Sequence, residues 1–167
     1  MVTPMAAISI RAPEVGDAAV AARLIEIQHA AYRIEADLIG YDGIPQLNET
    51  VNDLQAQPIS WLAAFDDDSI VGAIGFVTRP DGSCDIDRLV VDPDRARRGI
   101  GRALVEGVLD HPVVTVSTGA RNRPACAFYE SLGFHRTGER EVAPGVNVVE
   151  FTRPNPFLRG SGAGNRM

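Results

Sequence analysis

The sequence contains no lysine and only two cysteines, and each shortage excludes a kind of site. All 16 basic residues are arginine, so the chain has no lysine side chain to acetylate and no Gly-Lys-Ser/Thr motif of a P-loop. Cys84 and Cys126 form no CxxC pair, which argues against a zinc site and against a disulfide framework. We expect both cysteines to be structural thiols.

Long apolar segments are also missing. No run approaches the roughly 20 residues of a membrane-spanning helix, and the first dozen residues lack the apolar region of a signal peptide. The net charge of −6 argues against general binding to nucleic acid, which requires a basic surface. For a chain of 167 residues, we therefore expect one cytoplasmic domain with no nucleic-acid and no membrane partner.

The spacing of apolar residues predicts a mixed α/β domain. In chain order the expected elements are a strand at 8–11, a helix from Asp17 to about Glu35, a shorter helix capped by Asn48, strands at 59–65, 70–78 and 84–91, a helix after Gly101, a strand at 112–118, a helix starting at Asn122, and a hairpin of 134–139 and 146–152. We expect residues 1–154 to form the domain. Residues 155–167 contain several Gly, Pro and Ser, and are expected to form a flexible tail.

The most informative segment is 89–109. A β-branched strand stops at Asp92-Pro93, and an arginine-rich turn then opens an amphipathic helix. A helix N-terminus presents unpaired N–H groups and a favourable dipole to an anion. Gly99 and Gly101 allow close approach of the backbone because they carry no Cβ. We interpret the turn as a pyrophosphate site surrounded by four arginines, at positions 95, 97, 98 and 102.

Three ligands fit a glycine turn of this kind. A dinucleotide fingerprint would need a third glycine near position 104, which is leucine, and a P-loop would need a lysine. The remaining ligand is the pyrophosphate arm of coenzyme A.

Two segments then resemble motifs of one family. V-V-D-P-D-R-A-R-R-G-I-G-R-A-L resembles motif A of the GNAT superfamily of N-acetyltransferases, a strand ending in V-x-P followed by an R/Q-x-x-G-x-G/A turn and a helix. Ala96 stands where the family usually has arginine or glutamine, although the backbone donors do not depend on that side chain. N-R-P-A-C-A-F-Y-E-S-L-G-F, residues 122–134, resembles motif B, N-x-x-A-x-x-x-Y-x-x-x-G-F. By this resemblance the chain is identified as a GNAT member.

The resemblance implies a single α/β domain with a mixed, largely antiparallel central sheet, flanked by helices, in which strands 4 and 5 splay apart. It implies acetyl-CoA as co-substrate without a metal, and transfer of the acetyl group to a small-molecule or peptide amine within a ternary complex. Dimers are common in the family. The cofactor-binding residues implied are Leu89, Val90, Val91, Arg97, Arg98, Gly99, Ile100, Gly101, Arg102, Asn122 and Tyr129.

Tyr129 is the predicted general acid, because its motif position and its neutral O–H donor suit protonation of a departing thiolate. The helical pattern places Phe128 on the inner face and turns Tyr129 toward the edge. The alternative is that Tyr129 only packs on the helix. Asp87, and after it Asp85, are predicted to take the amine proton through water, with Glu35 as a third candidate. Alternatively these aspartates are solvated, or paired with Arg88 or Arg123.

The acceptor amine is expected to enter between residues 32–46 and a loop at 139–145. Tyr32, Glu35 and Tyr41 are the predicted substrate-binding residues, and the carboxylates on this side suit a cationic amine. Two other functions remain open. A non-catalytic module could bind acyl-CoA without turnover, and the glycine turn could bind a phosphate or nucleotide.

Overall fold

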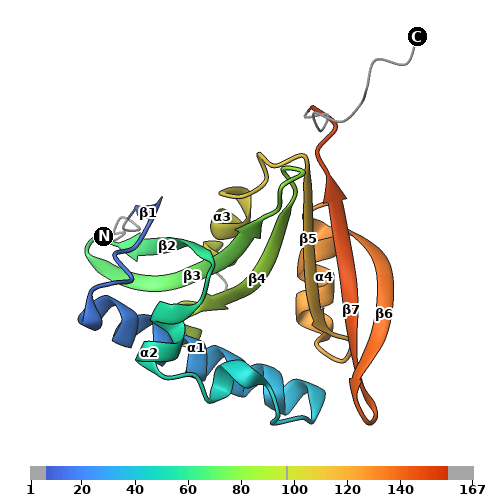
Figure 1. Cartoon of the computed structure of the whole chain (residues 1–167), viewed down its shortest axis with the longest axis horizontal. Helices are drawn as coiled ribbons and strands as arrows, with labels where there is room; N and C mark the ends of the chain where they lie inside the picture. The colour runs from blue at the N-terminus through green and yellow to red at the C-terminus, as the bar shows by residue number, and fades with distance from the viewer. Residues whose placement is uncertain (1–6, 97, 158–167) are drawn as a thin grey trace, which may run out of the picture.

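The computed structural model describes residues 7–96 and 98–157, in which seven strands form one sheet in the order β1-β2-β3-β4-β5-β7-β6 (Figure 1). The strands are β1 (Ile8–Arg11), β2 (Ser60–Asp66), β3 (Ser69–Thr78), β4 (Cys84–Val91), β5 (Val113–Gly119), β6 (His135–Ala143) and β7 (Val146–Pro154). The helices are α1 (Ala18–Ile39), α2 (Val51–Ala56), α3 (Ile100–Glu106) and α4 (Arg123–Ser131), with the 3-10 turns η1 (Pro45–Leu47) and η2 (Pro93–Arg95). The predicted mixed α/β fold is confirmed.

Strands β4 and β5 are the only parallel neighbours among the described strands. Their pairing covers three residue pairs, from Cys84 opposite Val114 to Ile86 opposite Val116. Beyond this point the strands diverge, so that they meet at one end and separate toward the other (Figure 1). The predicted splay of strands 4 and 5 is therefore confirmed.

A β-bulge interrupts β4 where the splay begins. Phe76 of β3 lies opposite Ile86, but the preceding Gly75 lies opposite Arg88, so Asp87 is an extra residue in β4. An extra residue changes which face each following side chain occupies. Accordingly, Ile86 packs beneath α3 and α4, whereas Val90 packs beneath α1 on the opposite face.

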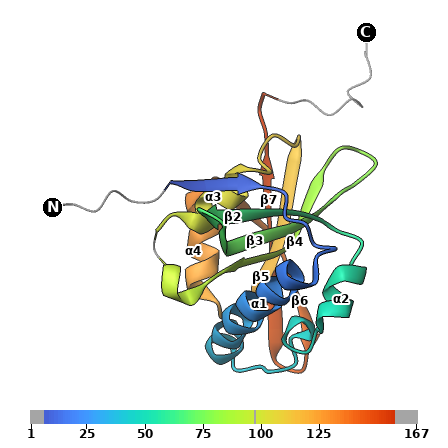
Figure 2. The same ribbon diagram turned by 90° about the vertical axis from the view of Figure 1, so that its left-hand side faces the viewer.

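Each face of the sheet carries its own apolar core, because α1 and α2 cover one face while α3 and α4 cover the other (Figure 2). The first core contains Leu104 of α3 and Val108 just after it, together with Phe134 and Phe151. The second core joins Leu24 of α1 to the strand residues of the other face. Burial of each large apolar side chain contributes about 1.5–3 kcal/mol relative to exposure. The two cores thus hold the two pairs of helices on opposite faces of the sheet.

Two helix boundaries differ from the sequence-based expectations. The first helix extends to Ile39, beyond Glu35, because its last turn buries Ala36 and Ile39 against Ile44 and Leu47 before Gly40 ends it with a φ of 65°. Helix α2 is capped by Thr50 and not by Asn48, so that expectation was wrong. Thr50 and Asp53 form a reciprocal capping box, which orients the start of this short helix.

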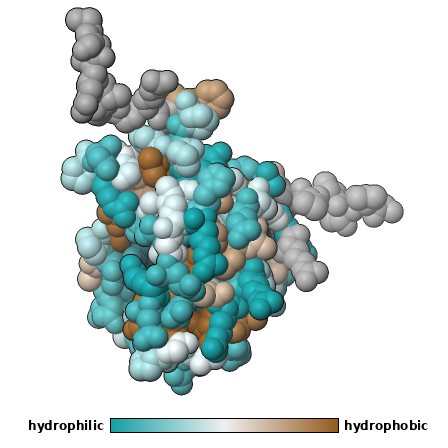
Figure 3. Space-filling view, turned by 90° about the vertical axis from the view of Figure 1, so that its right-hand side faces the viewer, coloured by the Kyte–Doolittle hydropathy of each residue, from teal (hydrophilic) through white to brown (hydrophobic). Residues whose placement is uncertain are grey.

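The C-terminal hairpin is also longer than expected. Strand β6 continues through Ala143, so most of the loop expected at 139–145 is strand, and the connection to β7 is short. Eight of the nine residues of β6 are exposed, and the side of the molecule that carries β6 is mainly hydrophilic (Figure 3). The cross-strand pairing with β7 therefore extends the hairpin where a loop was expected.

After β7, Asn155 is anchored, since its backbone N–H donates to Pro112 O at 2.8 Å and its Nδ2 donates to Leu109 O at 3.1 Å. Residues 158–167 of the expected tail, and Arg97 of the glycine turn, lie outside the described residues. No helix within the described ranges is long and apolar enough to cross a membrane.

Candidate active site

A cleft of about 450 Å³ opens where β4 and β5 diverge. Its walls come from α1, the segment containing η1, β4, β5, α4 and the β6–β7 hairpin. The sequence-predicted residues that it brings together are Tyr32, Glu35, Tyr41, Asp87, Leu89, Asn122 and Tyr129. Asp85 is not among its lining residues. The cleft therefore joins the predicted catalytic and substrate-binding residues from distant parts of the chain.

A second pocket, of about 600 Å³, lies over the glycine turn. It is lined by residues within 89–96, 99–102 and 124–132, including Gly99, Ile100, Gly101 and Arg102. Leu89, Ala125 and Phe128 line both pockets, so the two adjoin. Phe128 and Ala125 were not predicted as site residues. Ala125 is a specified position of motif B, whereas Phe128 occupies an unspecified one and gave no signal.

The glycine turn has the conformation that its sequence suggests. Gly99 caps α3 with a φ of 74°, which residues with a side chain rarely adopt. At Gly101, an added Cβ would lie 3.5 Å from the Phe128 ring and 3.8 Å from Val91, both of which line the second pocket. A larger side chain at Gly101 would therefore project into this pocket without clashing with backbone.

The positive charge around the turn is smaller than the sequence suggested. Arg95 forms an ion pair with Asp66, and Arg102 Nε lies 3.0 Å from Glu106 Oε1. Arg95 lines the second pocket as expected, but Asp66 at the end of β2 partly neutralises its charge. The pair of Arg102 is largely exposed and hence weak, so its guanidinium can exchange partners.

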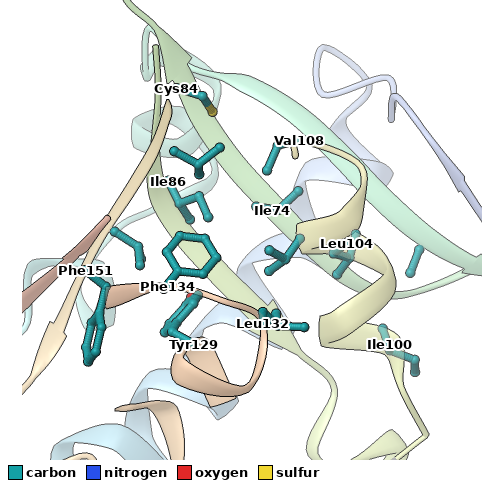
Figure 4. Close-up of a cluster of buried hydrophobic side chains, with 14 of the residues drawn as sticks. Ile74, Cys84, Ile86, Ile100, Leu104, Val108, Tyr129, Leu132, Phe134 and Phe151 are labelled. Carbon is teal, nitrogen blue, oxygen red and sulfur yellow. The ribbon is translucent and has the colours of Figure 1, made fainter. Parts of the chain in front are cut away.

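Tyr129 is buried, with 5% of its surface exposed. Its ring packs edge-on against Phe134, with ring centroids 5.3 Å apart, and Figure 4 shows it beside Leu132 and Phe151 in the apolar cluster. The expectation that Tyr129 faces the edge and Phe128 the inside is wrong, because Phe134 and Phe151 pack around the Tyr129 ring. Phe128 is instead half-buried and lines both pockets.

The hydroxyl of Tyr129 reaches the cleft. In the described part of the chain, no buried side-chain nitrogen or oxygen lacks a hydrogen-bond partner, yet this hydroxyl makes no hydrogen bond there. It must therefore be accessible from the cleft that Tyr129 lines. Burial, and secondarily the negative charge of Glu35, raise the pKa of Tyr129 well above its ordinary value. The phenol thus stays protonated at neutral pH and can donate.

Glu35 lies close to two of the three cleft tyrosines, Tyr32 and Tyr129. Its Oε1 accepts a hydrogen bond of 3.4 Å from Thr118 Oγ1 on β5. Burial raises the pKa of Tyr32 strongly, and Glu35 raises it further. Both phenols are therefore neutral at physiological pH. Glu35 thus places a carboxylate beside two uncharged tyrosines on the cleft wall.

The two strand aspartates occupy different surroundings. Asp87 lines the cleft, and its Oδ2 accepts a 2.6 Å charged hydrogen bond from Arg88 Nε. Asp85 Oδ1 accepts from Thr115 Oγ1 at 2.5 Å and lies 3.5 Å from the Arg79 guanidinium. The ion pair of Asp87 with Arg88, considered as an alternative from the sequence, is thus present in the structure. It leaves Asp87 on the cleft wall.

Comparison with known proteins identifies the family. The model of the acetyltransferase (GNAT) family matches residues 22–134, well over half of the chain. The chain belongs to the GNAT family. This match includes both sequence motifs, the lining of the second pocket and all of the cleft lining except the β6–β7 hairpin, and it confirms the predicted resemblance.

Two curated relatives of this GNAT chain are similar over most of its length. Peptidyl-lysine N-acetyltransferase YjaB of Salmonella typhimurium is 31% identical over 137 residues, which cover 81% of this chain and 87% of YjaB. UPF0157 protein YqkA of Bacillus subtilis is 35% identical over 139 residues, again 81% of this chain. The matched region spans only 40% of YqkA, so YqkA contains a large part that this match leaves out.

A solved structure agrees with the GNAT fold and shows a bound cofactor. The acetyltransferase yncA of Salmonella typhimurium, solved with acetyl-CoA, superposes with a TM-score of 0.66 at 16% identity. The alignment covers 89% of this chain and 94% of yncA. Acetyl-CoA is the co-substrate of this acetyltransferase domain. In the described residues, no three or more His, Cys, Asp or Glu side chains are grouped to hold a metal ion.

Proposed function

We propose that this domain transfers the acetyl group of acetyl-CoA directly to a primary amine within a ternary complex. The observation that carries the proposal is the cleft at the β4–β5 gap, which Tyr129, Glu35 and Asp87 line and which adjoins the second pocket at Leu89, Ala125 and Phe128. A direct transfer requires both substrates to meet at such a junction.

The cofactor lies along both pockets in this proposal. Because β5 pairs with β4 only as far as Ile86, the later β4 backbone groups that face β5 are available to the pantetheine arm at Leu89, Val90 and Val91. Backbone N–H groups there would polarise the thioester carbonyl as a fixed oxyanion site. Asn122 adds a side chain near the arm. The pyrophosphate takes the turn that contains Arg97, Arg98, Gly99, Ile100, Gly101 and Arg102.

The chemistry needs one base and one acid. The ammonium of the acceptor loses a proton through water to Asp87, and the neutral nitrogen then attacks the thioester carbonyl. As the C–S bond breaks, Tyr129 O–H donates its proton to the departing thiolate. The nitrogen is cationic after the attack, and it loses a second proton that restores the phenol through solvent. The first proton passes from Asp87 to bulk water, so the products are the amide, the free thiol and one proton. Glu35 is the alternative base, since it also lines the cleft. Asp85 has weaker support because it does not.

The raised pKa of Tyr129 affects this step in a defined direction. Burial and Glu35 keep the proton on the free enzyme, which secures the donor but weakens it as an acid. A cationic amine bound beside Glu35 would offset the negative charge and lower the pKa of Tyr129 again. Substrate binding would then strengthen the acid when it is needed.

The acceptor class follows from the acceptor wall, which we define as Tyr41, Ile44, Val142 and Val146. These side chains present an apolar surface, and Glu35 and Asp87 supply negative charge to the same cleft, which Arg88 and Arg140 also line. A lysine side chain has the matching chemistry, because an apolar stem carries a terminal ammonium. YjaB is named as a peptidyl-lysine N-acetyltransferase. We therefore propose a lysine side chain in a peptide as the preferred acceptor.

An assay of free thiol release from acetyl-CoA tests this function. The acceptors are a peptide with blocked ends and one lysine, the same peptide with acetyllysine as control, a peptide with a free N-terminal alanine, and spermidine. Turnover with the first peptide and none with its control is expected. Tight acetyl-CoA binding without turnover on any amine would instead indicate a non-catalytic acyl-CoA-binding module. Preference for ATP over coenzyme A in calorimetry would indicate a nucleotide site.

A further inference from the structure

A buried polar cluster lies behind the cleft. Arg88, whose side chain is 2% exposed, donates from Nε to Asp87 Oδ2 at 2.6 Å and from Nη1 to Glu49 Oε2 at 2.5 Å. Nη1 also donates to Gln28 Oε1 at 2.9 Å. We call Gln28, Glu49, Asp87 and Arg88 the Arg88 cluster. It joins α1, the β4 bulge and the segment that precedes α2.

Further hydrogen bonds close the Arg88 cluster. Gln28 Nε2 donates to Glu49 Oε2 at 2.6 Å and to the Gln46 carbonyl at 3.0 Å. Gln57 Nε2 donates to the other oxygen of Glu49 at 3.0 Å. Both carboxylate oxygens of Glu49 therefore accept hydrogen bonds. The Gln46–Glu49 segment is held by Gln28 of α1 and by Gln57, which follows α2.

Burying the charged Arg88 cluster costs more free energy of desolvation than filling the same space with apolar side chains. Burial opposes the charge of Arg88, but hydrogen bonds to Glu49 and Asp87 outweigh it and raise the pKa of the guanidinium. Apolar side chains of similar volume often stabilise a fold as well as, or better than, a buried ion pair. Fold stability therefore does not explain why a charged group occupies this place. The position of Arg88 beside the acceptor side of the cleft suggests a functional reason instead.

Two geometric facts connect the Arg88 cluster with the acceptor. One guanidinium serves two carboxylates, so the cluster keeps one net negative charge, and both Asp87 and Arg88 line the cleft, whereas Gln28 and Glu49 do not. The segment that it fixes, Gln46–Glu49, follows directly on Tyr41 and Ile44 of the acceptor wall. Any movement of Arg88 would displace both the bulged carboxylate and this wall.

We propose that Arg88 is a positioning residue for the acceptor amine, acting through Asp87 on one side and through Gln28 and Glu49 on the other. This inference rests on the proposed function and deepens it. Glu49 is the decisive partner, because it does not line the cleft and is held in place by Arg88, Gln28 and Gln57. A change at Glu49 should therefore reach the acceptor only through the cluster.

The test compares Glu49→Gln with Glu26→Gln. Both remove the charge of an ion-paired glutamate, but Glu26 pairs with Arg23 away from the cleft. We expect Glu49→Gln to raise the KM of the lysine peptide or lower its kcat, by about 3- to 30-fold in kcat/KM. The Kd of acetyl-CoA in calorimetry should not change, and Glu26→Gln should match the wild type in every value.

A second variant and a stability measurement separate positioning from folding. Arg88→Lys keeps the charge but cannot make the same two-sided contacts, so it should also lose kcat/KM for the peptide. A melting temperature lowered in both variants, with peptide kinetics of the folded enzyme equal to the wild type, would overturn the inference and leave the proposed function intact. Absence of turnover in the wild type itself would overturn the proposed function and, with it, this role of Arg88.

Discussion

The two pockets that adjoin at Leu89 and Phe128 are built in different ways. The cofactor pocket uses residues within 89–96, 99–102 and 124–132, and its expected contacts are largely backbone groups of β4 and the glycine turn. The cleft on the acceptor side is assembled from side chains of α1, η1, β4, β5, α4 and the β6–β7 hairpin. Its carboxylates and tyrosines come close only through the fold.

This difference teaches where substrate specificity resides. A backbone-lined pocket tolerates changes in most side chains, provided that its glycines remain, and it therefore suits a cofactor of fixed chemistry. A wall of side chains held by a buried cluster changes its shape and charge with single substitutions. Variants on the two sides should consequently separate acetyl-CoA binding from amine turnover.

The largest expected effect is that of Tyr129→Phe. The variant keeps the ring that packs against Phe134 but removes the proposed proton donor, so kcat should fall by about 10²-fold or more. The Kd of acetyl-CoA in calorimetry should remain nearly the same, because the pyrophosphate seat is untouched. An unchanged kcat would remove Tyr129 from the mechanism and would show that its role is packing.

Asp87→Asn should have the next largest effect. Loss of the proposed base should lower kcat/KM for the lysine peptide by about 10- to 100-fold, with acetyl-CoA affinity retained. Asp85→Asn is the matched control from the same strand, and it should act weakly because Asp85 does not line the cleft. A strong effect at Asp85 and none at Asp87 would reverse their proposed order.

Gly101→Val should impair the cofactor pocket and leave the acceptor side of the cleft unchanged. Its Cβ would find ordinary contact with Phe128, so the fold should persist, while the methyl groups would enter the cofactor pocket. We expect the Kd of coenzyme A to rise by about tenfold or more, equivalent to about 1.4 kcal/mol. Gly16→Val, where an added Cβ meets nothing within 4 Å, is the control. Normal affinity in Gly101→Val would refute this seat.

The same contrast explains how far the sequence could be interpreted. The glycine turn and motif B lie in continuous segments, and periodicity places their helices and strands, so the family and the fold could be predicted. The splay was expected only through the family resemblance. The position of the bulge, at Asp87, and the role of Arg88 could not be predicted, because the first depends on the register with β3 and the second on contacts to Gln28 and Glu49.

Tyr129 shows a related difficulty. Helical spacing assigned Phe128 to the inner face, because that residue continues the stripe of Ala125 and Leu132. The face that is buried depends on Phe134 and Phe151, which follow α4 in sequence and pack around the Tyr129 ring. In a helix as short as α4, a rotation by one residue is decided by such tertiary contacts.

The smallest expected effect concerns pH. Burial and Glu35 raise the pKa of Tyr129, so the protonated form that the mechanism requires should persist above the ordinary phenol value of about 10. The pH dependence of kcat/KM reports the free enzyme, so Tyr129 should cause no fall in kcat/KM as pH rises through that value. Glu35→Gln removes a negative charge and should lower the pKa of Tyr129, moving the alkaline fall in kcat/KM down by about one unit or less. The change should be absent in Glu26→Gln, which lies outside the cleft. An alkaline limb that is the same in wild type and Glu35→Gln would show that Tyr129 titrates independently of the acceptor side.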